Sequence, residues 1–128
     1  MKIKKQIDCV KFKILYSMSW GETKMEKLTN ETFTTTINNE HLVLVDFYAD
    51  WCGPCKMMHP VLEDINNNND KGLKIAQINV DDYPEVAANY GVQSIPNMIL
   101  FKDGKPVNQV IGFMNKDALL AKLGGDLN

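Results

Sequence analysis

The stretch Val45-Asp46-Phe47-Tyr48-Ala49-Asp50-Trp51-Cys52-Gly53-Pro54-Cys55-Lys56 decides the fold that we expect for this chain. It joins an apolar run, His41 to Ala49, to a cysteine pair. The run is dense in β-branched and aromatic residues and is interrupted by Asp46, which is typical of a parallel-sheet strand covered on both faces. After it, four apolar residues at i, i+3, i+4 and i+7 predict a helix from the cysteines to about Ile65: Met58, Val61, Leu62 and Ile65. A C-x-x-C that follows a buried strand and opens a helix is typical of a redox motif.

Shorter elements precede this stretch. Met25 to Leu28 predicts a short strand. Thr29 can cap the helix that follows, because its hydroxyl can accept a hydrogen bond from a free backbone N–H of the first turn. Phe33 and Ile37 lie four residues apart and would face the core from that helix.

Beyond the cysteine helix the alternation of strand and helix continues. We expect the asparagine run at 66–69 to end the helix and Leu73 to Val80 to form the next strand. Asp82 and Glu85, three residues apart, predict a capping box for a further helix, with Pro84 in its first turn and Gly91 as its end.

The last third of the chain predicts a hairpin and a helix. Asp103-Gly104 is a strong hairpin signal between the strands Asn97 to Phe101 and Val107 to Ile111, because glycine accepts the positive φ that such turns need. Asn115 can cap a last helix that carries Leu119, Leu120 and Leu123 and ends at Gly124-Gly125. The whole order is β-α-β-α-β-α-β-β-α. This order predicts an α/β fold in which a central mixed sheet, parallel except for the C-terminal antiparallel hairpin, is flanked by helices.

Composition divides the 128 residues at Met25. Residues 1–24 carry six Lys against two acids, a net charge of +4, whereas residues 25–128 carry eight Lys against fourteen acids, a net charge of −6. An acidic body is a poor nucleic-acid binder, because phosphate contacts need clustered cations. No stretch reaches the roughly 18 consecutive apolar residues that a membrane span needs. We therefore expect one domain at 25–128 that binds neither nucleic acid nor membrane.

The extension at 1–24 keeps three interpretations open. It is a disordered basic tail, the product of a start codon chosen too far upstream, or a degenerate targeting segment. The apolar stretch Ile14 to Tyr16 is too short for an export signal, which favours the first two. Cys9 lies in this extension and is interpreted as an incidental thiol.

Cys52 and Cys55 carry the predicted chemistry. The free N–H groups and the dipole of a helix N-terminus stabilise an anion, so they favour the thiolate of Cys52, which is the nearer cysteine to the end. The thiolate is the reactive form of cysteine. We expect Cys52 to be the nucleophile and Cys55, one turn further in and more buried, to be the resolving thiol.

Resolution needs an acceptor for the Cys55 proton, and Asp46 is the candidate. A carboxylate within an apolar strand is desolvated, which raises its pKa toward the range that suits a general base near neutral pH. An equally weighted alternative is an aspartate that backbone donors satisfy at the end of a strand. Both interpretations stay open from the sequence.

A metal site is the other use of a cysteine pair. A structural zinc site usually takes four ligands. The spare candidates Cys9, His41 and His59 do not stand at a familiar spacing from the pair, so we expect no metal. His59 is interpreted as a surface or packing residue, and His41 as the start of a strand.

Val45 to Lys56 closely resembles the active-site signature of the thioredoxin family, in which WCGPC is far more specific than a bare C-x-x-C. The resemblance runs from about Met25 to the C-terminus. It includes Ile95-Pro96, similar to a loop whose cis-proline faces the redox pair, and Phe101 to Lys105, similar to a hairpin of the family. Pro60 resembles a proline that kinks the active-site helix, and Gly112 a glycine of the docking surface. Taken without the resemblance, Pro96 would be expected in the commoner trans form.

The resemblance implies a general protein-disulfide reductase with the thioredoxin fold. It would act as a monomer in the cytoplasm, without a bound cofactor other than its own redox disulfide. Electrons would come from NADPH through a thioredoxin reductase, and the targets would be of the ribonucleotide reductase, peroxiredoxin and methionine sulfoxide reductase types. A flat apolar patch would dock these partners, and Lys56 and Pro60 would support the site; the patch residues are Trp51, Gly53, Pro54, Ile95, Pro96 and Gly112.

Two positions depart from the family pattern. Asn97 stands where members usually have Thr after the cis-proline, and Gln77 stands where many have a Lys near the buried acid. Without that cation, Asp46 should be at least as hard to ionise as in relatives. Two alternatives to the reductase remain: an exported disulfide oxidase or isomerase, and a non-catalytic thioredoxin-like binding subunit.

Overall fold

The computed structural model describes residues 25–68 and 72–127, which form five strands and four α-helices. The predictions for residues 1–24, including Cys9, lie outside the described residues. In chain order the elements are β1 (Glu26–Lys27), α2 (Asn30–Asn39), β2 (Leu42–Tyr48), α3 (Gly53–Asn68), β3 (Leu73–Asn79), α4 (Pro84–Asn89), β4 (Asn97–Lys102), β5 (Lys105–Ile111) and α5 (Lys116–Leu123), followed by a 3₁₀ turn, η1 (Gly124–Asp126).

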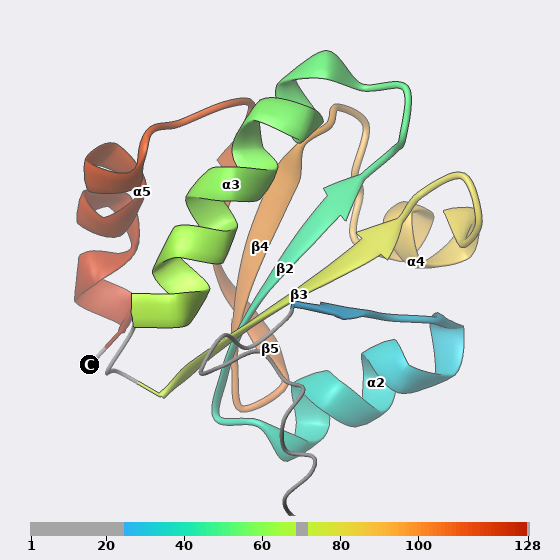
Figure 1. Ribbon diagram of the computed structural model, residues 1–128. Helices are drawn as coiled ribbons and strands as arrows, with labels where there is room; N and C mark the ends of the chain where they lie inside the picture. The colour runs from blue at the N-terminus through green and yellow to red at the C-terminus, as the bar shows by residue number, and fades with distance from the viewer. Residues whose placement is uncertain (1–24, 69–71, 128) are drawn as a thin grey trace, which may run out of the picture.

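The strands form one mixed sheet in the order β1-β3-β2-β4-β5. β3 pairs in parallel with both β1 and β2, while β4 runs antiparallel to β2 and β5 antiparallel to β4. Figure 1 shows α3 and α5 on one side of the sheet, with α2 and α4 on the other. The predicted α/β class, the mixed sheet and the element order are confirmed.

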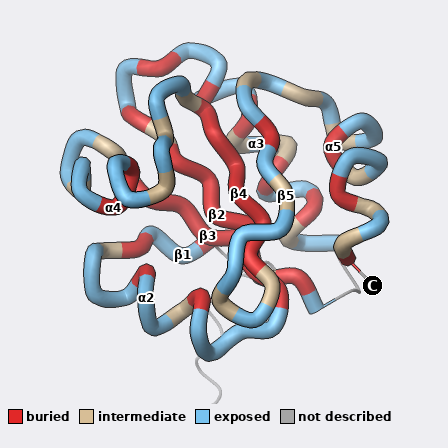
Figure 2. The backbone as a smooth tube through the Cα atoms, turned by 180° about the vertical axis from the view of Figure 1, so that it is seen from behind, coloured by how far each residue is buried: buried red, intermediate tan, exposed pale blue. Residues whose placement is uncertain are grey.

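The side chains of β2 point alternately to the two faces of the sheet, and both faces are buried. Val43, Val45 and Phe47 face α2 and α4, where they pack with Phe33 and other apolar residues. Leu42 and Leu44 face α3 and α5, in a second and mainly aliphatic cluster. Figure 2 shows β2, β3 and β4 as buried along most of their length. Continuous apolarity in β2 therefore reflects a strand covered on both faces, as predicted.

Several local predictions are confirmed in detail. The Thr29 hydroxyl accepts from the Thr32 N–H at 3.2 Å, and Asn115 Oδ1 accepts from the Ala118 N–H at 2.9 Å, so both caps are present. The hairpin turn has positive φ at both central residues, 53° at Asp103 and 85° at Gly104, as a tight two-residue turn requires.

Other local predictions are wrong. The capping box of Asp82 and Glu85 is absent, since Tyr83 is the N-cap of α4 and makes no side-chain capping bond. The Asn79 side chain accepts from the N–H groups of Asp81 and Asp82 instead, and so holds the turn before the helix.

One helix end also differs from the prediction. α3 continues beyond Ile65 to Asn68, so the helix takes up most of the asparagine run. α5 ends before Gly124 as expected, and the backbone continues through Gly124 as the 3₁₀ turn η1, with φ at −53°. Within the described ranges, no helix is long and apolar enough to cross a membrane.

Candidate active site

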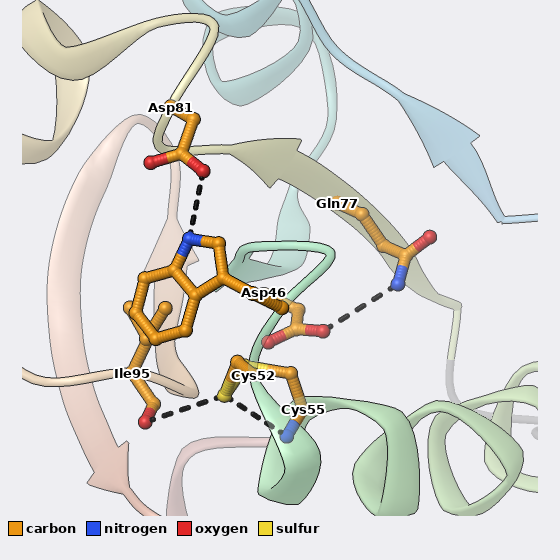
Figure 3. Close-up of a disulfide and its surroundings, with 7 residues drawn as sticks. Asp46, Cys52, Cys55, Gln77, Asp81 and Ile95 are labelled. Carbon is orange, nitrogen blue, oxygen red and sulfur yellow. Dashed lines mark hydrogen bonds between the residues drawn. A yellow bond between two sulfur atoms is a disulfide. The ribbon is translucent and has the colours of Figure 1, made fainter.

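The chain leaves β2 and enters α3 through a short loop that holds the cysteine pair. The Cys52 N–H donates to the Ala49 carbonyl at 3.3 Å, and the Lys56 N–H donates to the Cys52 carbonyl at 3.2 Å. Cys52 and Cys55 are joined by a disulfide, with their Cα atoms 5.2 Å apart (Figure 3). The predicted redox pair therefore stands at the N-terminal end of a 16-residue helix.

The two sulfurs differ in backbone contacts rather than in burial. The Cys55 N–H donates to Cys52 Sγ at 3.2 Å, so an N–H of the first helical turn points at the Cys52 sulfur. This contact and the helix dipole favour negative charge on Cys52 once the disulfide is open. Both cysteines are buried, with exposed fractions of 5% for Cys52 and 4% for Cys55, so burial hardly distinguishes the two. Both pack with Ala49 against Tyr48, Val80 and Ile95.

A loop before β4 faces the disulfide. The Ile95–Pro96 peptide bond is cis, as the family resemblance implied and against the expectation for an isolated X-Pro. The Ile95 carbonyl oxygen lies 3.8 Å from Cys52 Sγ (Figure 3). The Gly112 N–H donates to the Pro96 carbonyl at 2.8 Å, and φ is +89° at Gly112. Ile95, Pro96 and Gly112 are thus brought together next to Cys52.

Asn97 follows this loop and departs from the family pattern. Its side chain is buried, and its Oδ1 accepts from Gln109 Nε2 on β5 at 3.0 Å. A buried amide with a partner carries a smaller desolvation cost than an unpaired one. β5 therefore supplies the polar contact that this position needs.

The residues of the predicted docking patch differ in how far they are exposed to solvent. Trp51 is 70% exposed, and its indole N–H donates to Asp81 Oδ2 at 2.9 Å (Figure 3). Gly53 and Pro54 are also exposed. Ile95 and Gly112, by contrast, are half-buried, and Pro96 is buried. The exposed surface at this end of the sheet is therefore formed mainly by the loop before α3 and by the first turn of that helix.

Sequence reasoning missed several residues around the disulfide. Met57 lies one turn beyond Gly53 on α3 and is exposed, as are Ile111 and Phe113, which flank Gly112. Asp81 was also missed, because only the loop after β3 brings it to the indole of Trp51. The three apolar side chains stand outside the active-site motif, so the motif gives no signal for them.

Asp46 is fully buried on the α3 side of the sheet. Its Oδ2 accepts from Gln77 Nε2 at 3.5 Å, whereas Oδ1 has no hydrogen-bond partner among the described residues. Burial raises the pKa of Asp46 from the ordinary 3.8 to about 7, and the hydrogen bond from Gln77 offsets part of that rise. The alternative of an aspartate satisfied by backbone donors is therefore wrong.

A cavity of about 190 Å³ adjoins the cysteine pair. Cys55 and Gln77 both line it, so the resolving sulfur and the partner of Asp46 border the same space; its other lining residues are Lys27, Tyr48, Ala49, Asp50, Lys56 and His59. A water needs about 10–15 Å³ and two or more polar partners, so the cavity can hold several. Water can thus reach both Cys55 and the side chain that bonds to Asp46.

The remaining candidates from the sequence lie around this core. Lys56 is exposed at the cavity, and Pro60 is exposed within α3, where it supplies no backbone N–H. His41 precedes β2, and its Nδ1 lies 2.7 Å from Asp103 Oδ1 at the opposite end of the strand from the cysteines. In the part of the chain that the structure describes, no group of three or more His, Cys, Asp and Glu side chains is arranged to hold a metal ion.

A disulfide at the start of a helix, with the Ile95-Pro96 loop against it, defines a dithiol–disulfide redox protein. The sequence matches the family described as Thioredoxin over residues 24–124. It is 47% identical over 96 residues to thioredoxin of Alicyclobacillus acidocaldarius, covering 75% of this chain and 91% of the relative. It is 49% identical over 98 residues to thioredoxin of Mycobacterium tuberculosis, covering 76% of this chain and 84% of the relative.

Solved structures agree with the sequence comparisons. A single-site mutant of thioredoxin from Halobacterium salinarum superposes with a TM-score of 0.73 at 34% identity, covering 83% of this chain and 96% of that one. A second chain comes from a structure on thiol resolution in yeast mitochondrial 1-Cys peroxiredoxin via glutathione/thioredoxin systems. It superposes with a TM-score of 0.73 at 33% identity, covering 82% of this chain and 98% of that one. The chain belongs to the thioredoxin family. It is accordingly a protein-disulfide oxidoreductase whose redox centre is the Cys52–Cys55 pair.

Proposed function

We propose that the chain works in the reducing direction, with Cys52 as the attacking thiolate and Cys55 as the resolving thiol. The observation that carries this assignment is the Cys55 N–H at 3.2 Å from Cys52 Sγ, at the N-terminal end of α3. A donor fixed there stabilises a thiolate on Cys52 before any target binds. Cys55 has no corresponding place at the helix end.

The reaction balances over two exchanges. The Cys52 thiolate attacks one sulfur of a target disulfide, a mixed disulfide forms, and the second target sulfur leaves as a thiolate. Cys55 then loses its proton and attacks Cys52 Sγ, which releases the first target sulfur as a thiolate. The target gains two electrons, and the chain ends with the Cys52–Cys55 disulfide seen in the structure.

Asp46 is the proposed acceptor of the Cys55 proton, through water in the adjoining cavity. A pKa of about 7 suits a base that must accept a proton and return it near neutral pH. Asp46 Oδ1, which has no partner among the described residues, leaves an acceptor site free on the carboxylate. Cys55 and Gln77 line the same cavity, which supports a short water path between the sulfur and the acid.

The surface around the disulfide is the proposed docking site for partner proteins. Its exposed part comprises Trp51, Gly53, Pro54, Met57, Ile111 and Phe113. Ile95 and Gly112, which are half-buried, and Pro96, which is buried, belong to the same surface next to Cys52. An extended segment of a partner that lies over Ile95 would bring its disulfide to the Cys52 sulfur.

The proposed partners follow from the family. We propose a thioredoxin reductase as electron donor, drawing on NADPH. Targets of the peroxiredoxin type fit the yeast structure named above, and those of the ribonucleotide reductase and methionine sulfoxide reductase types follow from the resemblance. We further propose a monomer in the cytoplasm, where protein thiols are kept reduced.

Trapping the mixed disulfide tests the assignment of the two cysteines. The assay follows reduction of insulin disulfides by dithiothreitol in a Cys9→Ser background, which removes the third thiol. Cys52→Ser should abolish the acceleration, whereas reduced Cys55→Ser, mixed with insulin after the dithiothreitol has been removed, should accumulate a covalent adduct between Cys52 and insulin, seen by mass spectrometry. Acceleration that persists without Cys52 would overturn the proposal and favour a binding subunit.

The proposed role of Asp46 has its own test. The rate of the resolving step should rise with pH through about 7, because Asp46 must be ionised to accept the proton. Asp46→Asn should slow this step and remove the rise with that midpoint. Stopped-flow measurement of mixed-disulfide decay checks both, and an unchanged pH profile in Asp46→Asn would contradict the role.

A further inference from the structure

We propose that His59 is a positioning residue for Asp46: its Nδ1 accepts from the Gln77 amide and thereby holds the amide nitrogen toward the buried carboxylate. The inference rests on the proposed role of Asp46 as the proton acceptor. It assigns a function to two residues, His59 and Gln77, that the sequence left as a packing residue and as a departure from the family pattern.

The fold brings the three side chains to one place from three elements. Asp46 and Gln77 are register partners in the parallel pair of β2 and β3, so their side chains share the face that lies under α3. His59 stands four residues after Cys55, so both lie on the same face of α3. His59, Cys55 and Gln77 also line the same cavity.

Counting donors determines the direction of each contact. Gln77 Nε2 lies 3.5 Å from Asp46 Oδ2 and 3.1 Å from His59 Nδ1. An amide nitrogen only donates, and it has two hydrogens, so it can serve both acceptors at once. His59 Nδ1 must then carry no proton, and the proton of the neutral ring sits on Nε2. That nitrogen lies 3.3 Å from Glu63 Oε2, a carboxylate that suits an N–H donor.

The opposite orientation of the Gln77 amide would harm an ionised Asp46. It would place the amide oxygen against both the carboxylate and His59 Nδ1, where three acceptors would face one another. His59 in the Nε2–H tautomer therefore favours the orientation in which Gln77 donates to Asp46. Since Asp46 Oδ1 has no partner among the described residues, the bond from Gln77 to Oδ2 is the side-chain contact that favours the ionised carboxylate.

Other charged and titratable groups surround the site and must be kept constant in a test. They come from β1, β2 with its following loop, and α3: Lys27, Tyr48, Asp50, Cys55, Lys56 and Glu63. The hydrogen bond to Asp46 Oδ2, by contrast, comes from Gln77, which carries no charge. A substitution confined to His59 leaves these side chains unsubstituted, and His59→Ala and His59→Asn both remove the contact with Glu63, so comparing the two variants cancels its effect.

The test is an NMR titration of the Asp46 carboxyl carbon in the oxidised, full-length protein. His59→Ala should raise the pKa of Asp46 by about half a unit, the size expected when one hydrogen bond to the charged form weakens. His59→Asn is the matched variant, because its Oδ1 lies near the position of Nδ1 and accepts from Gln77 without adding charge. It should leave the Asp46 pKa near that of the unmodified chain.

A double-mutant cycle separates positioning from a direct effect of the histidine. In a Gln77→Met background, His59→Ala should no longer move the Asp46 pKa, because a residue that acts through Gln77 has nothing left to act on. The proposal is overturned if His59→Ala leaves the pKa unchanged, if Asn and Ala raise it equally, or if the shift persists in the Gln77→Met background.

A measurement on the unmodified chain adds an independent check that needs no variant. Long-range ¹H–¹⁵N correlation of the neutral His59 ring should show the proton on Nε2, and a proton on Nδ1 would overturn the proposal. The pKa and tautomer results do not depend on whether Asp46 is the base. Two results can therefore be told apart. If Asp46→Asn leaves the rate of the resolving step unchanged while His59→Ala still raises the Asp46 pKa, then Asp46 is not the base but His59 does position Gln77 against it.

Discussion

Beneath α2 and α4, the sheet packs against an aromatic cluster, whereas beneath α3 and α5 it packs against aliphatic side chains and a buried acid. On the first face, Phe101 meets Phe33 and Tyr90 edge-on, at ring-centroid distances of 5.7 and 5.3 Å. On the second face, Asp46 and Gln77 interrupt an otherwise aliphatic core. Each aromatic pair adds about 0.5–1.5 kcal/mol beyond area burial, while an ionised acid in a core costs stability.

The difference shows how one strand serves two purposes. β2 contributes Phe47 to the aromatic face and Asp46 to the redox face, although the two residues are adjacent. A strand buried on both sides can place an acid behind the cysteines while its other side remains apolar. We infer that the α2/α4 face supplies stability that offsets the cost of keeping Asp46 buried on the other.

Truncating the aromatic face should have the largest effect on stability. Phe101→Ala removes a fully buried ring and should lower the free energy of unfolding by about 3–5 kcal/mol. It should leave the pH dependence that Asp46 causes unchanged, because Phe101 faces the other way. Urea unfolding of the oxidised protein at acidic and at mildly alkaline pH checks both statements. A loss below about 1 kcal/mol would show that the aromatic cluster is not the stabilising face.

Removing the buried acid, in contrast, should increase the free energy of unfolding. The pKa of Asp46 is raised on folding, so between pH 3.8 and about 7 the folded chain binds more protons than the unfolded chain. Stability from this residue is therefore full below pH 3.8 and is lost as pH rises toward about 7. The loss is on the order of 4 kcal/mol, since one pKa unit corresponds to about 1.4 kcal/mol.

Asp46→Leu should consequently stabilise the oxidised protein by up to about 4 kcal/mol above the raised pKa and by little below pH 3.8. Urea unfolding across this pH range provides the measurement, with Phe101→Ala as the control that keeps the acid. Parallel stability curves for the variant and the unmodified chain would mean that burial does not penalise the ionised form of Asp46.

Removing the N-cap side chains of α2 and α5 should give the smallest losses of stability, and the two losses should be equal. Thr29 caps α2 on the aromatic side, and Asn115 caps α5 on the redox side. Thr29→Ala and Asn115→Ala should each cost about 1 kcal/mol, because each leaves a backbone N–H without its acceptor. Thermal unfolding compares them. Losses that differ by more than about 1 kcal/mol would show that one face tolerates local damage better than the other.

Local sequence signals predicted most of the architecture. β-branched runs, the Asp103-Gly104 turn, the Thr29 and Asn115 caps and the helical stripe after Cys55 depend on residues near one another in the chain. The active-site motif likewise predicted the cysteine pair and the buried Asp46 from residues adjacent in the sequence. The Asp82 capping box failed because Asn79 accepts from the Asp82 N–H, the donor that Glu85 would have bonded, and because α4 takes Tyr83 as its N-cap.

Features that depend on how elements meet could not be predicted in this way. The Gln77–His59 contact requires the β2–β3 register together with the packing of α3, and the Trp51–Asp81 bond joins two loops 30 residues apart in sequence. The near-equal burial of the two cysteines likewise follows from the packing of Ile95 against them. Each of these features depends on contacts between segments distant in sequence, which local patterns do not report.

The reduction potential of the Cys52–Cys55 pair tests the central claim, that this chain is a protein-disulfide reductase. We would equilibrate the Cys9→Ser protein with a defined thiol–disulfide buffer and quantify both redox forms. We predict a potential at or below that of the cytosolic glutathione pool, so that electrons flow from the chain to its targets. A potential well above that pool would contradict the claim, because the folded chain would then favour its dithiol form and oxidise other proteins.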